Sequence, residues 1–193
     1  MNEFFNISDE ILNLAAKAEE ELKPQFKAID EITEYNQNKV LKAFIDNNVS
    51  ESCFGTTTGY GYDDKGRDTL ERVFAQIMNT EDAIIRHNFV SGTHTITVAL
   101  FGLLRPGDTL LSVAGMPYDT LRGVIGISPK DGSLKEFGVN YEQIDLDENG
   151  GIDYNALEER LKSSPVKIAY IQRSRGYETR PSLTISEIEK TVK

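Results

Sequence analysis

Residues 91–125 read SGTHTITVALFGLLRPGDTLLSVAGMPYDTLRGVI, and this stretch decides the fold. The apolar residues of 91–104 predict a helix, and the Arg-Pro-Gly-Asp sequence at 105–108 is typical of a turn. The run 109–113 predicts a strand, and 118–125 predicts a second helix soon after it. Because strands that alternate with helices form βαβ units, this stretch predicts a parallel sheet.

The same alternation continues toward the C-terminus. Residues 139–146 and 166–172 predict two further strands, and residues 154–162 and 182–193 predict the helices that follow them. We therefore expect an α/β domain with a mostly parallel sheet of βαβ units over residues 51–193. The last predicted helix ends where another strand is due. We expect this domain to be incomplete, and the alternative is a sheet that is closed by a partner chain.

Residues 1–50 form a separate expected unit, a helical arm. Ser8 and Asp9 are capping residue types ahead of an apolar pattern that runs to residue 48, and Pro24 is expected to break or kink this helix. The arm is strongly acidic, as a solvated helix face would be. Two interpretations stay open: the arm packs on a partner subunit, or it lies on its own domain.

A segment rich in Gly, Thr, Tyr and Asp joins the arm to a helix predicted over 69–78. This segment, FGTTTGYGYDDKGRD at 54–68, has the chemistry of a loop. Long aperiodic loops inside a compact chain tend to be functional, and the alternative is an ordinary connector.

Composition excludes several classes of protein. The 193 residues carry 21 Lys and Arg against 31 Asp and Glu, a net charge of −10, which argues against nucleic acid as the partner. No apolar run approaches the roughly 18 residues of a membrane-spanning helix. Cys53 is the single cysteine, so the chain cannot form an intramolecular disulfide. The acidic N-terminus lacks the basic start of a signal peptide, and we expect a cytoplasmic protein.

The first candidate site is Ser91-Gly92-Thr93, at the start of the helix predicted over 91–104. A helix N-terminus offers free backbone N–H groups and the positive end of a dipole, which together suit a phosphate. Gly92 would admit an anion close to the backbone, and the two hydroxyls add donors. The alternative is an ordinary N-cap that binds nothing.

Two further candidates follow predicted strands. Tyr118 comes after the strand at 109–113, where a flat ring can face an aromatic ligand or simply pack over a helix start. Arg173 and Arg175 come after the strand at 166–172, where they can bind a carboxylate or phosphate or form surface ion pairs.

Other common sites are not supported. The sequence has no G-x-G-x-x-G and no P-loop pattern, so ordinary nucleotide binding is disfavoured. His87 and His94 have no accompanying metal-ligand pattern, and no G-x-S-x-G elbow is present. A phosphate-favouring helix start, an aromatic face and an arginine pair at strand ends fit a phosphorylated aromatic cofactor with a carboxylate-bearing substrate, as for pyridoxal phosphate and an amino acid.

Five segments also carry a resemblance: TGYGYDDKGRDTLE (58–71), FVSGTH (89–94), LLRPGDTLLSVAGMPYDT (103–120), DGSLKEFGV (131–139) and IQRSRGY (171–177). From about residue 40 onward the chain resembles the aluminium-resistance or methionine gamma-lyase-like family. This family is a branch of the pyridoxal-phosphate enzymes of aspartate-aminotransferase fold and is related to the cystathionine lyases.

The resemblance implies roles for particular residues. Ser91, Gly92 and Thr93 match the serine–glycine turn that holds the cofactor phosphate, and Tyr118 matches the tyrosine that stacks on the pyridine ring. Tyr60 or Tyr62, with Arg67, matches a loop that reaches the phosphate of the neighbouring subunit. Arg173 and Arg175 lie where a strand end approaches the cofactor and are candidates for substrate binding. The family's active sites lie between chains, so a homo-oligomer, dimer or tetramer, is expected.

The sequence also departs from the family pattern. The family continues past this length and there supplies an aspartate for the pyridine nitrogen and a lysine that bonds to the cofactor aldehyde, and neither motif is matched here. We therefore expect the N-terminal portion of a pyridoxal-phosphate-dependent carbon–sulfur lyase, acting on a sulfur-containing amino acid and inactive alone. The alternative is a non-catalytic α/β module for anion binding or oligomerisation.

Overall fold

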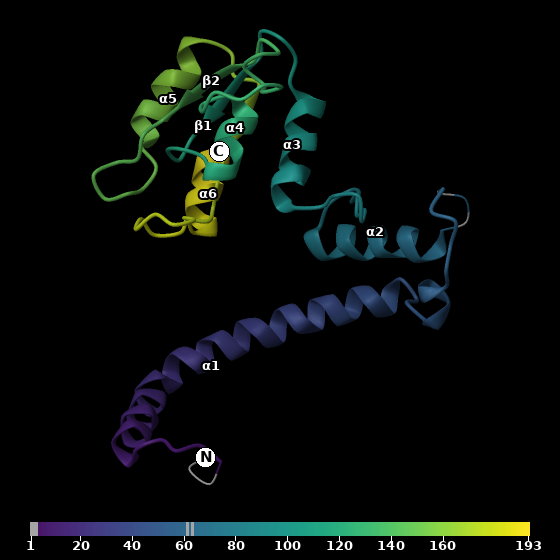
Figure 1. Cartoon of the computed structure of the whole chain (residues 1–193), viewed down its shortest axis with the longest axis vertical. Coiled ribbons are helices and arrows are strands. Elements are labelled where there is room, and N and C mark those ends of the chain that lie inside the picture. The colour runs from purple at the N-terminus through teal and green to yellow at the C-terminus, as the bar shows by residue number, and fades with distance from the viewer. Residues whose placement is uncertain (1–3, 61, 63) are drawn as a thin grey trace. The chain divides into compact units, whose positions relative to one another are not determined.

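The computed structural model describes residues 4–60, 62 and 64–193 (Figure 1). The chain divides into two compact units, Met1–His87 and Asn88–Lys193. The boundary proposed from the sequence at residue 50 stays a prediction, because compactness alone does not define the parts of a larger fold.

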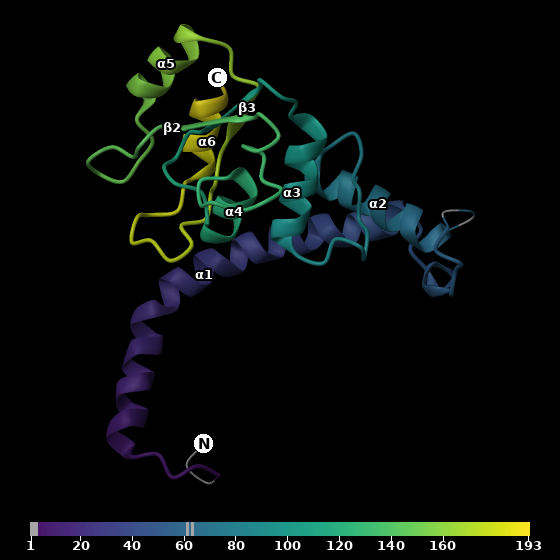
Figure 2. The same cartoon turned by 45° about the horizontal axis from the view of Figure 1, so that its top comes forward.

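The first unit is helical. It contains α1 (Asp9–Asp46), a short 3₁₀ helix η1 (Glu51–Phe54) and α2 (Lys65–Met78). The Ser8 hydroxyl accepts a hydrogen bond from the Ile11 N–H at 3.4 Å, as the predicted N-cap requires. The helix continues through Pro24, and the ribbon of α1 bends in its N-terminal half (Figure 2). Pro24 therefore lies within a bent helix rather than at its end.

The α2 helix begins earlier than the sequence pattern indicates. Residues 65–68, expected to belong to the loop, form its first turn. The Asp64 carboxylate accepts a hydrogen bond from the Arg67 N–H at 3.2 Å and caps the helix. Gly66 suggests a loop in the sequence, but a Cβ at this position would lie 2.2 Å from the Cys53 carbonyl oxygen. The glycine is there because η1 and α2 approach each other closely.

The second unit is built on a three-stranded parallel sheet. Its strands are β1 (Thr109–Ser112), β2 (Asn140–Gln143) and β3 (Ile168–Tyr170), in the order β2-β1-β3. Both neighbours pair with β1 in parallel, which confirms the expected α/β architecture. The helices are α3 (Gly92–Leu103), α4 (Asp119–Ile125), α5 (Tyr154–Ser163) and α6 (Ile185–Val192).

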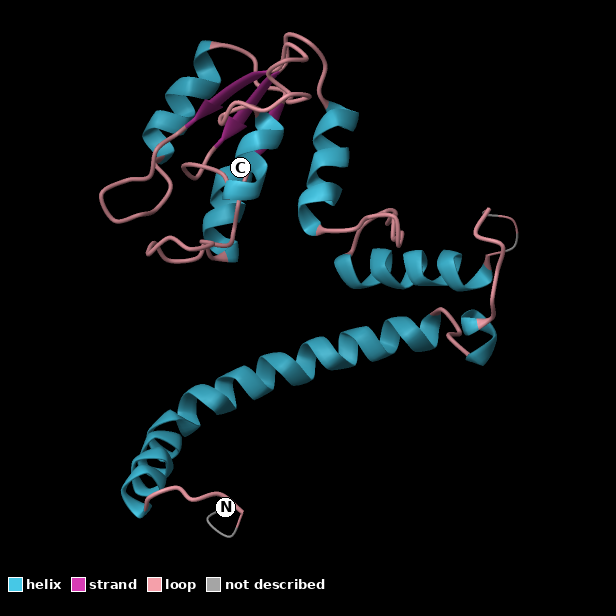
Figure 3. Ribbon diagram, viewed as in Figure 1, coloured by secondary structure: helices cyan, strands magenta, loops and turns pink. Residues whose placement is uncertain are grey.

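Helices cover both faces of this sheet (Figure 3). Successive residues of β1 point to opposite faces, so Leu110 and Leu111 enter different cores. Leu110 packs with side chains of α3 and α4, and Leu111 packs with Leu157 of α5 and with Leu183 just before α6. The sheet is thus the middle of three layers, and its strand ends are where a site can form. Within the described residues, no helix is long and apolar enough to cross a membrane.

Candidate functional site

A cleft of about 240 Å³ lies in the second unit, at the carboxyl ends of β1 and β3. One wall comes from the start of α3, another from the start of α4, and the third from the end of β3 and the residues after it. The residues that line it are Thr93, Ile96, Tyr118, Thr120, Leu121, Tyr170, Gln172 and Ser174. The first and second sequence candidates, which lie more than twenty residues apart, therefore share one cleft.

The α3 wall presents the predicted helix start. The Ser91 hydroxyl accepts a hydrogen bond from the His94 N–H at 3.1 Å and caps α3. Gly92 and Thr93 are the first residues of the helix, so their N–H groups have no acceptor within it. The Thr93 hydroxyl lies 2.7 Å from that of Thr120 at the start of α4. A Cβ at Gly92 would meet nothing within 4 Å, so the approach to these amides is open.

Tyr118 is held by its backbone and is half-buried. Its N–H donates a hydrogen bond to Oε1 of Gln172 at 2.8 Å. Its ring stacks on that of Tyr177, with centroids 6.1 Å apart and planes at 29°. The neighbouring Tyr177 hydroxyl raises the pKa of Tyr118 above its usual value, and the nearby Asp119 carboxylate acts in the same direction. Tyr118 therefore keeps its proton well above neutral pH.

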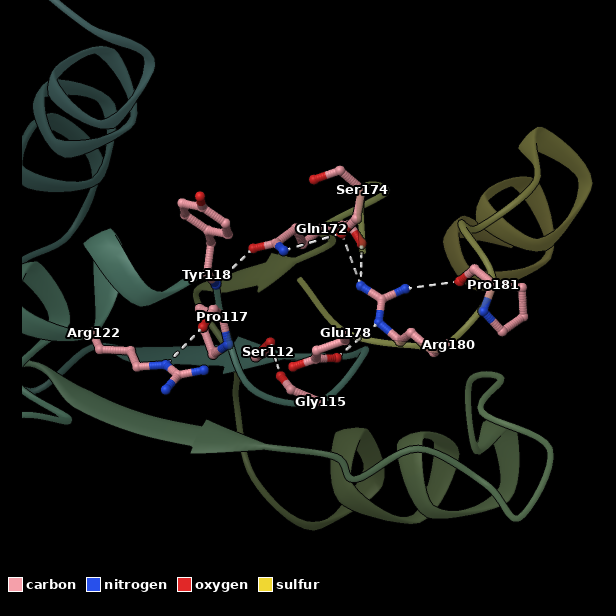
Figure 4. A network of polar contacts seen from close by, with 10 residues as sticks. All are labelled: Ser112, Gly115, Pro117, Tyr118, Arg122, Gln172, Ser174, Glu178, Arg180 and Pro181. Carbon is pink, nitrogen blue, oxygen red and sulfur yellow. Dashed lines mark hydrogen bonds and ion pairs between the residues drawn. The ribbon is translucent and has the colours of Figure 1, made fainter. Parts of the chain in front are cut away.

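A buried arginine organises the third wall (Figure 4). Arg180 is only 8% exposed, and its guanidinium donates hydrogen bonds to the Ser174 carbonyl at 2.9 Å and the Gln172 carbonyl at 3.4 Å. Its Nε lies 3.3 Å from the Glu178 carboxylate. The Gln172 side-chain amide donates to the Ser174 carbonyl at 3.1 Å. Arg180 and Gln172 thus both donate to the Ser174 carbonyl. These hydrogen bonds fix the turn at residues 172–174, the corner after β3, and this corner holds the backbone of Tyr118.

The lining has a definite chemistry. It offers hydroxyl and amide groups, aromatic rings and aliphatic side chains, and among these residues there is no lysine and no carboxylate. Free amides at a helix start bind an oxyanion, and a tyrosine face binds a flat ring. The donor set fits the phosphate and ring of a phosphorylated aromatic compound. It contains no amine that could bond to an aldehyde.

Three more of the predicted residues belong to the first unit, whereas the cleft belongs to the second. Tyr60 and Tyr62 are 83% and 84% exposed and belong to the first unit. Arg67, in the same unit, faces the carboxylates of Asp64 at 3.8 Å and Asp68 at 3.5 Å. Their expected role at a neighbouring subunit stays a prediction.

The two arginines after β3 do not line the cleft, although Ser174 between them does. Arg173 donates from Nε to the Leu183 carbonyl at 3.1 Å, so its side chain is engaged with backbone. Arg175 is exposed, and its guanidinium makes no hydrogen bond or ion pair within residues 4–60, 62 and 64–193. A role for either in substrate binding stays a prediction.

Two residues of the site were not found from sequence. Gln172 belongs to the IQRSRGY segment (171–177) but has no role predicted from sequence, and Arg180 lies outside the quoted segments. No local sequence pattern predicts that an arginine will be buried. The available signal is their position at and after the end of the strand predicted over 166–172. Polar side chains of a parallel sheet gather at such strand ends.

Comparisons with known proteins agree with this structure. A family model described as methionine gamma-lyase matches residues 11–193. The YnbB protein of Bacillus subtilis (strain 168), which is uncharacterized, is 44% identical over 181 residues, 93% of this chain and 43% of that protein.

Solved structures show the same relationship. A protein of Clostridium acetobutylicum, named as involved in aluminium resistance, has a TM-score of 0.93 at 49% identity, covering 99% of this chain and 46% of that one. A carbon–sulfur lyase involved in aluminium resistance from Clostridium novyi NT has a TM-score of 0.92 at 47% identity, with the same coverage. This chain thus spans less than half the length of these relatives. On the match over residues 11–193, the chain belongs to the methionine gamma-lyase family.

Proposed function

We propose that this chain is the N-terminal portion of a pyridoxal-phosphate-dependent carbon–sulfur lyase that acts on a sulfur-containing amino acid in the cytoplasm. One observation carries the proposal: the open helix start at Thr93 and the ring of Tyr118 line the same cleft at the ends of parallel strands. The family membership and the name of the Clostridium novyi relative support the reaction class.

The proposal gives a part to five residues in or beside the cleft. The N–H groups of Gly92 and Thr93, with the Ser91 and Thr93 hydroxyls, hold the phosphate. The Tyr118 ring lies against the pyridine ring, and Gln172 keeps the Tyr118 backbone in place through the 2.8 Å hydrogen bond. When bound, the cofactor supplies the electron sink that an elimination at an amino acid requires.

We also propose that the chain alone does not catalyse the reaction. The cleft lining lacks a lysine, so the cofactor would bind here through its phosphate and ring only. The chain is incubated with pyridoxal phosphate, reduced with borohydride and digested for mass spectrometry. We expect no pyridoxyl adduct concentrated at one lysine, and a stable adduct at a single lysine would refute the proposed inactivity.

A ligand without an aldehyde tests the cleft itself. Pyridoxamine 5′-phosphate is fluorescent and needs no lysine, so its titration reports phosphate and ring binding alone. Tyr118→Leu should weaken its binding by about 2- to 10-fold, the value of a stacking contact of about 0.5–1.5 kcal/mol. Tyr35→Leu, at an exposed position of α1, is the control and should change nothing.

The outcomes separate the two candidate functions. Binding of pyridoxamine phosphate that depends on Tyr118 supports the enzyme proposal. Binding of inorganic phosphate without any preference for the ring compound would instead favour the non-catalytic anion-binding module. No binding of either compound would remove the cleft from consideration.

We further propose that the protein is a homo-oligomer with α1 in the contact between copies. Apolar side chains recur on one face of α1 and are exposed: Ile11, Leu14, Leu22, Phe26, Ile29, Ile32, Val40 and Phe44. Ala43, on the same face, is already buried within the first unit, where the end of α1 packs against α2, so the part of the stripe that is free for another copy is its N-terminal part. A second copy of the same helix would bury this stripe. A contiguous apolar surface of this length is unfavourable in contact with water.

A further inference from the structure

Gly176 lies directly against the ring of Tyr118. A Cβ built on Gly176 would lie 2.8 Å from Cδ2 and 2.9 Å from Cε2 of Tyr118, closer than carbon atoms approach each other. The residue has a φ of +59°, in the left-handed region that favours glycine. The backbone at this position and the tyrosine ring thus occupy adjoining space with no room for a side chain between them.

The backbone that carries this ring is held in place. The backbone of Tyr118 is tied to Gln172 by a 2.8 Å hydrogen bond, and the preceding Pro117 is fully buried. Gln172 in turn holds the Ser174 carbonyl, which Arg180 also holds (Figure 4). The anchor of Tyr118 and the segment that carries Gly176 therefore arise from the same fixed corner.

We propose that Gly176 is a positioning residue, whose bare backbone sets the orientation of the Tyr118 ring in the cleft. A flat ligand stacks well only on a ring that is presented at the correct angle. A side chain at 176 would turn the tyrosine ring or push the segment away, and either change would spoil the stacking face. The amides of Gly92 and Thr93 at the start of α3 would remain as they are. As far as it concerns a ligand, this inference rests on the proposed function.

A matched glycine provides the control for the test. Gly132 is also exposed, has a φ of +75°, and would meet nothing within 4 Å if it carried a Cβ. Gly176→Ala and Gly132→Ala thus share the cost of a left-handed alanine, and only the first pushes on Tyr118. Both are made in the full chain and titrated with pyridoxamine 5′-phosphate and with inorganic phosphate.

We expect Gly176→Ala to weaken pyridoxamine phosphate binding by roughly 2- to 10-fold, the range of a lost stacking contact, while phosphate binding stays the same. Gly132→Ala should leave both affinities unchanged. Equal pyridoxamine phosphate affinities for the two variants would overturn the proposal.

A double-mutant cycle tests the contact without any ligand. Gly176→Ala should lower the urea midpoint of unfolding more than Gly132→Ala does. In a Tyr118→Ala background, which removes the opposing ring, the two glycine substitutions should have equal effects. If the excess effect of Gly176→Ala persists in that background, the contact with Tyr118 is not its cause and the inference fails. If the cycle succeeds but no variant binds pyridoxamine phosphate, the proposed function fails and the steric role of Gly176 stands.

Discussion

At the scale of single residues, Arg180 shows how a buried charge can support the walls of the candidate site. Its guanidinium contacts the carbonyls of Gln172, Ser174 and Pro181, and it has one carboxylate partner, Glu178. Each of these carbonyls would lose a donor if the guanidinium were removed. The Ser174 carbonyl would keep the Gln172 side-chain amide as a donor, and each hydrogen bond that is lost contributes about 0.5–1.5 kcal/mol.

This arrangement predicts a large effect of Arg180→Met. We expect it to destabilise the fold by about 1–3 kcal/mol, because it removes several hydrogen bonds of the buried guanidinium, as measured by urea unfolding. Arg175→Met, at the exposed arginine five residues away, should change stability by less than about 0.5 kcal/mol. Equal stability of the two variants would show that Arg180 does not hold the corner after β3.

The site residues differ in how far they can be predicted from sequence. Ser91–Thr93 and Tyr118 follow from helix-start and strand-end chemistry, which are local, and the structure places Thr93 and Tyr118 in one cleft. Gly176 and Arg180 depend on what lies opposite them in three dimensions. A glycine next to a tyrosine ring looks in sequence like any turn glycine, and burial of an arginine is decided by tertiary packing.

At the scale of elements, the helices and strands of the second unit follow from the sequence. The bounds of α3, β1, α4 and α5 agree with the expected ranges to within one residue, whereas β2, β3 and α6 are shorter than expected. The strand expected over 166–172 is paired only at Ile168–Tyr170, because its apolar pattern extends past the residues that reach β1. In the first unit, Gly66 suggests a loop in the sequence at the position where α2 begins. Periodicity detects the buried face of an element, while its ends depend on capping and close approach.

The bend of α1 leads to a prediction at this scale. Pro24 has no N–H to donate to the Glu20 carbonyl, and its ring collides with that carbonyl in a straight helix. Pro24→Ala should raise the helical circular dichroism signal and stabilise α1 by up to about 3 kcal/mol. Lys23→Ala, which changes a neighbouring exposed position, should have little effect. A loss of stability in Pro24→Ala would mean instead that the bend is needed by contacts elsewhere.

At the scale of the whole molecule, the apolar stripe of α1 predicts assembly. Ile29 lies in the middle of the stripe, and Asn38 lies on the opposite face of the helix. Ile29→Glu should shift the protein toward monomer, because it places a charge in the contact between copies. Asn38→Glu adds the same charge outside the contact and should leave the assembly intact. Sedimentation at several concentrations measures both.

A monomeric wild-type chain at all concentrations would contradict the proposed contact through α1. A wild-type oligomer that survives Ile29→Glu would show that the copies meet through another surface.

The sheet has one more practical consequence. The outer rims of β2 and β3 have no strand beside them in the part of the chain that the structure describes. Unpaired strand edges of this kind form hydrogen bonds with extended segments of other chains during synthesis, before packing is complete. Both rims are short, with four and three residues, which limits the hazard without abolishing it. Slow, cool expression in dilute culture should therefore keep more of this polypeptide out of inclusion bodies than rapid induction.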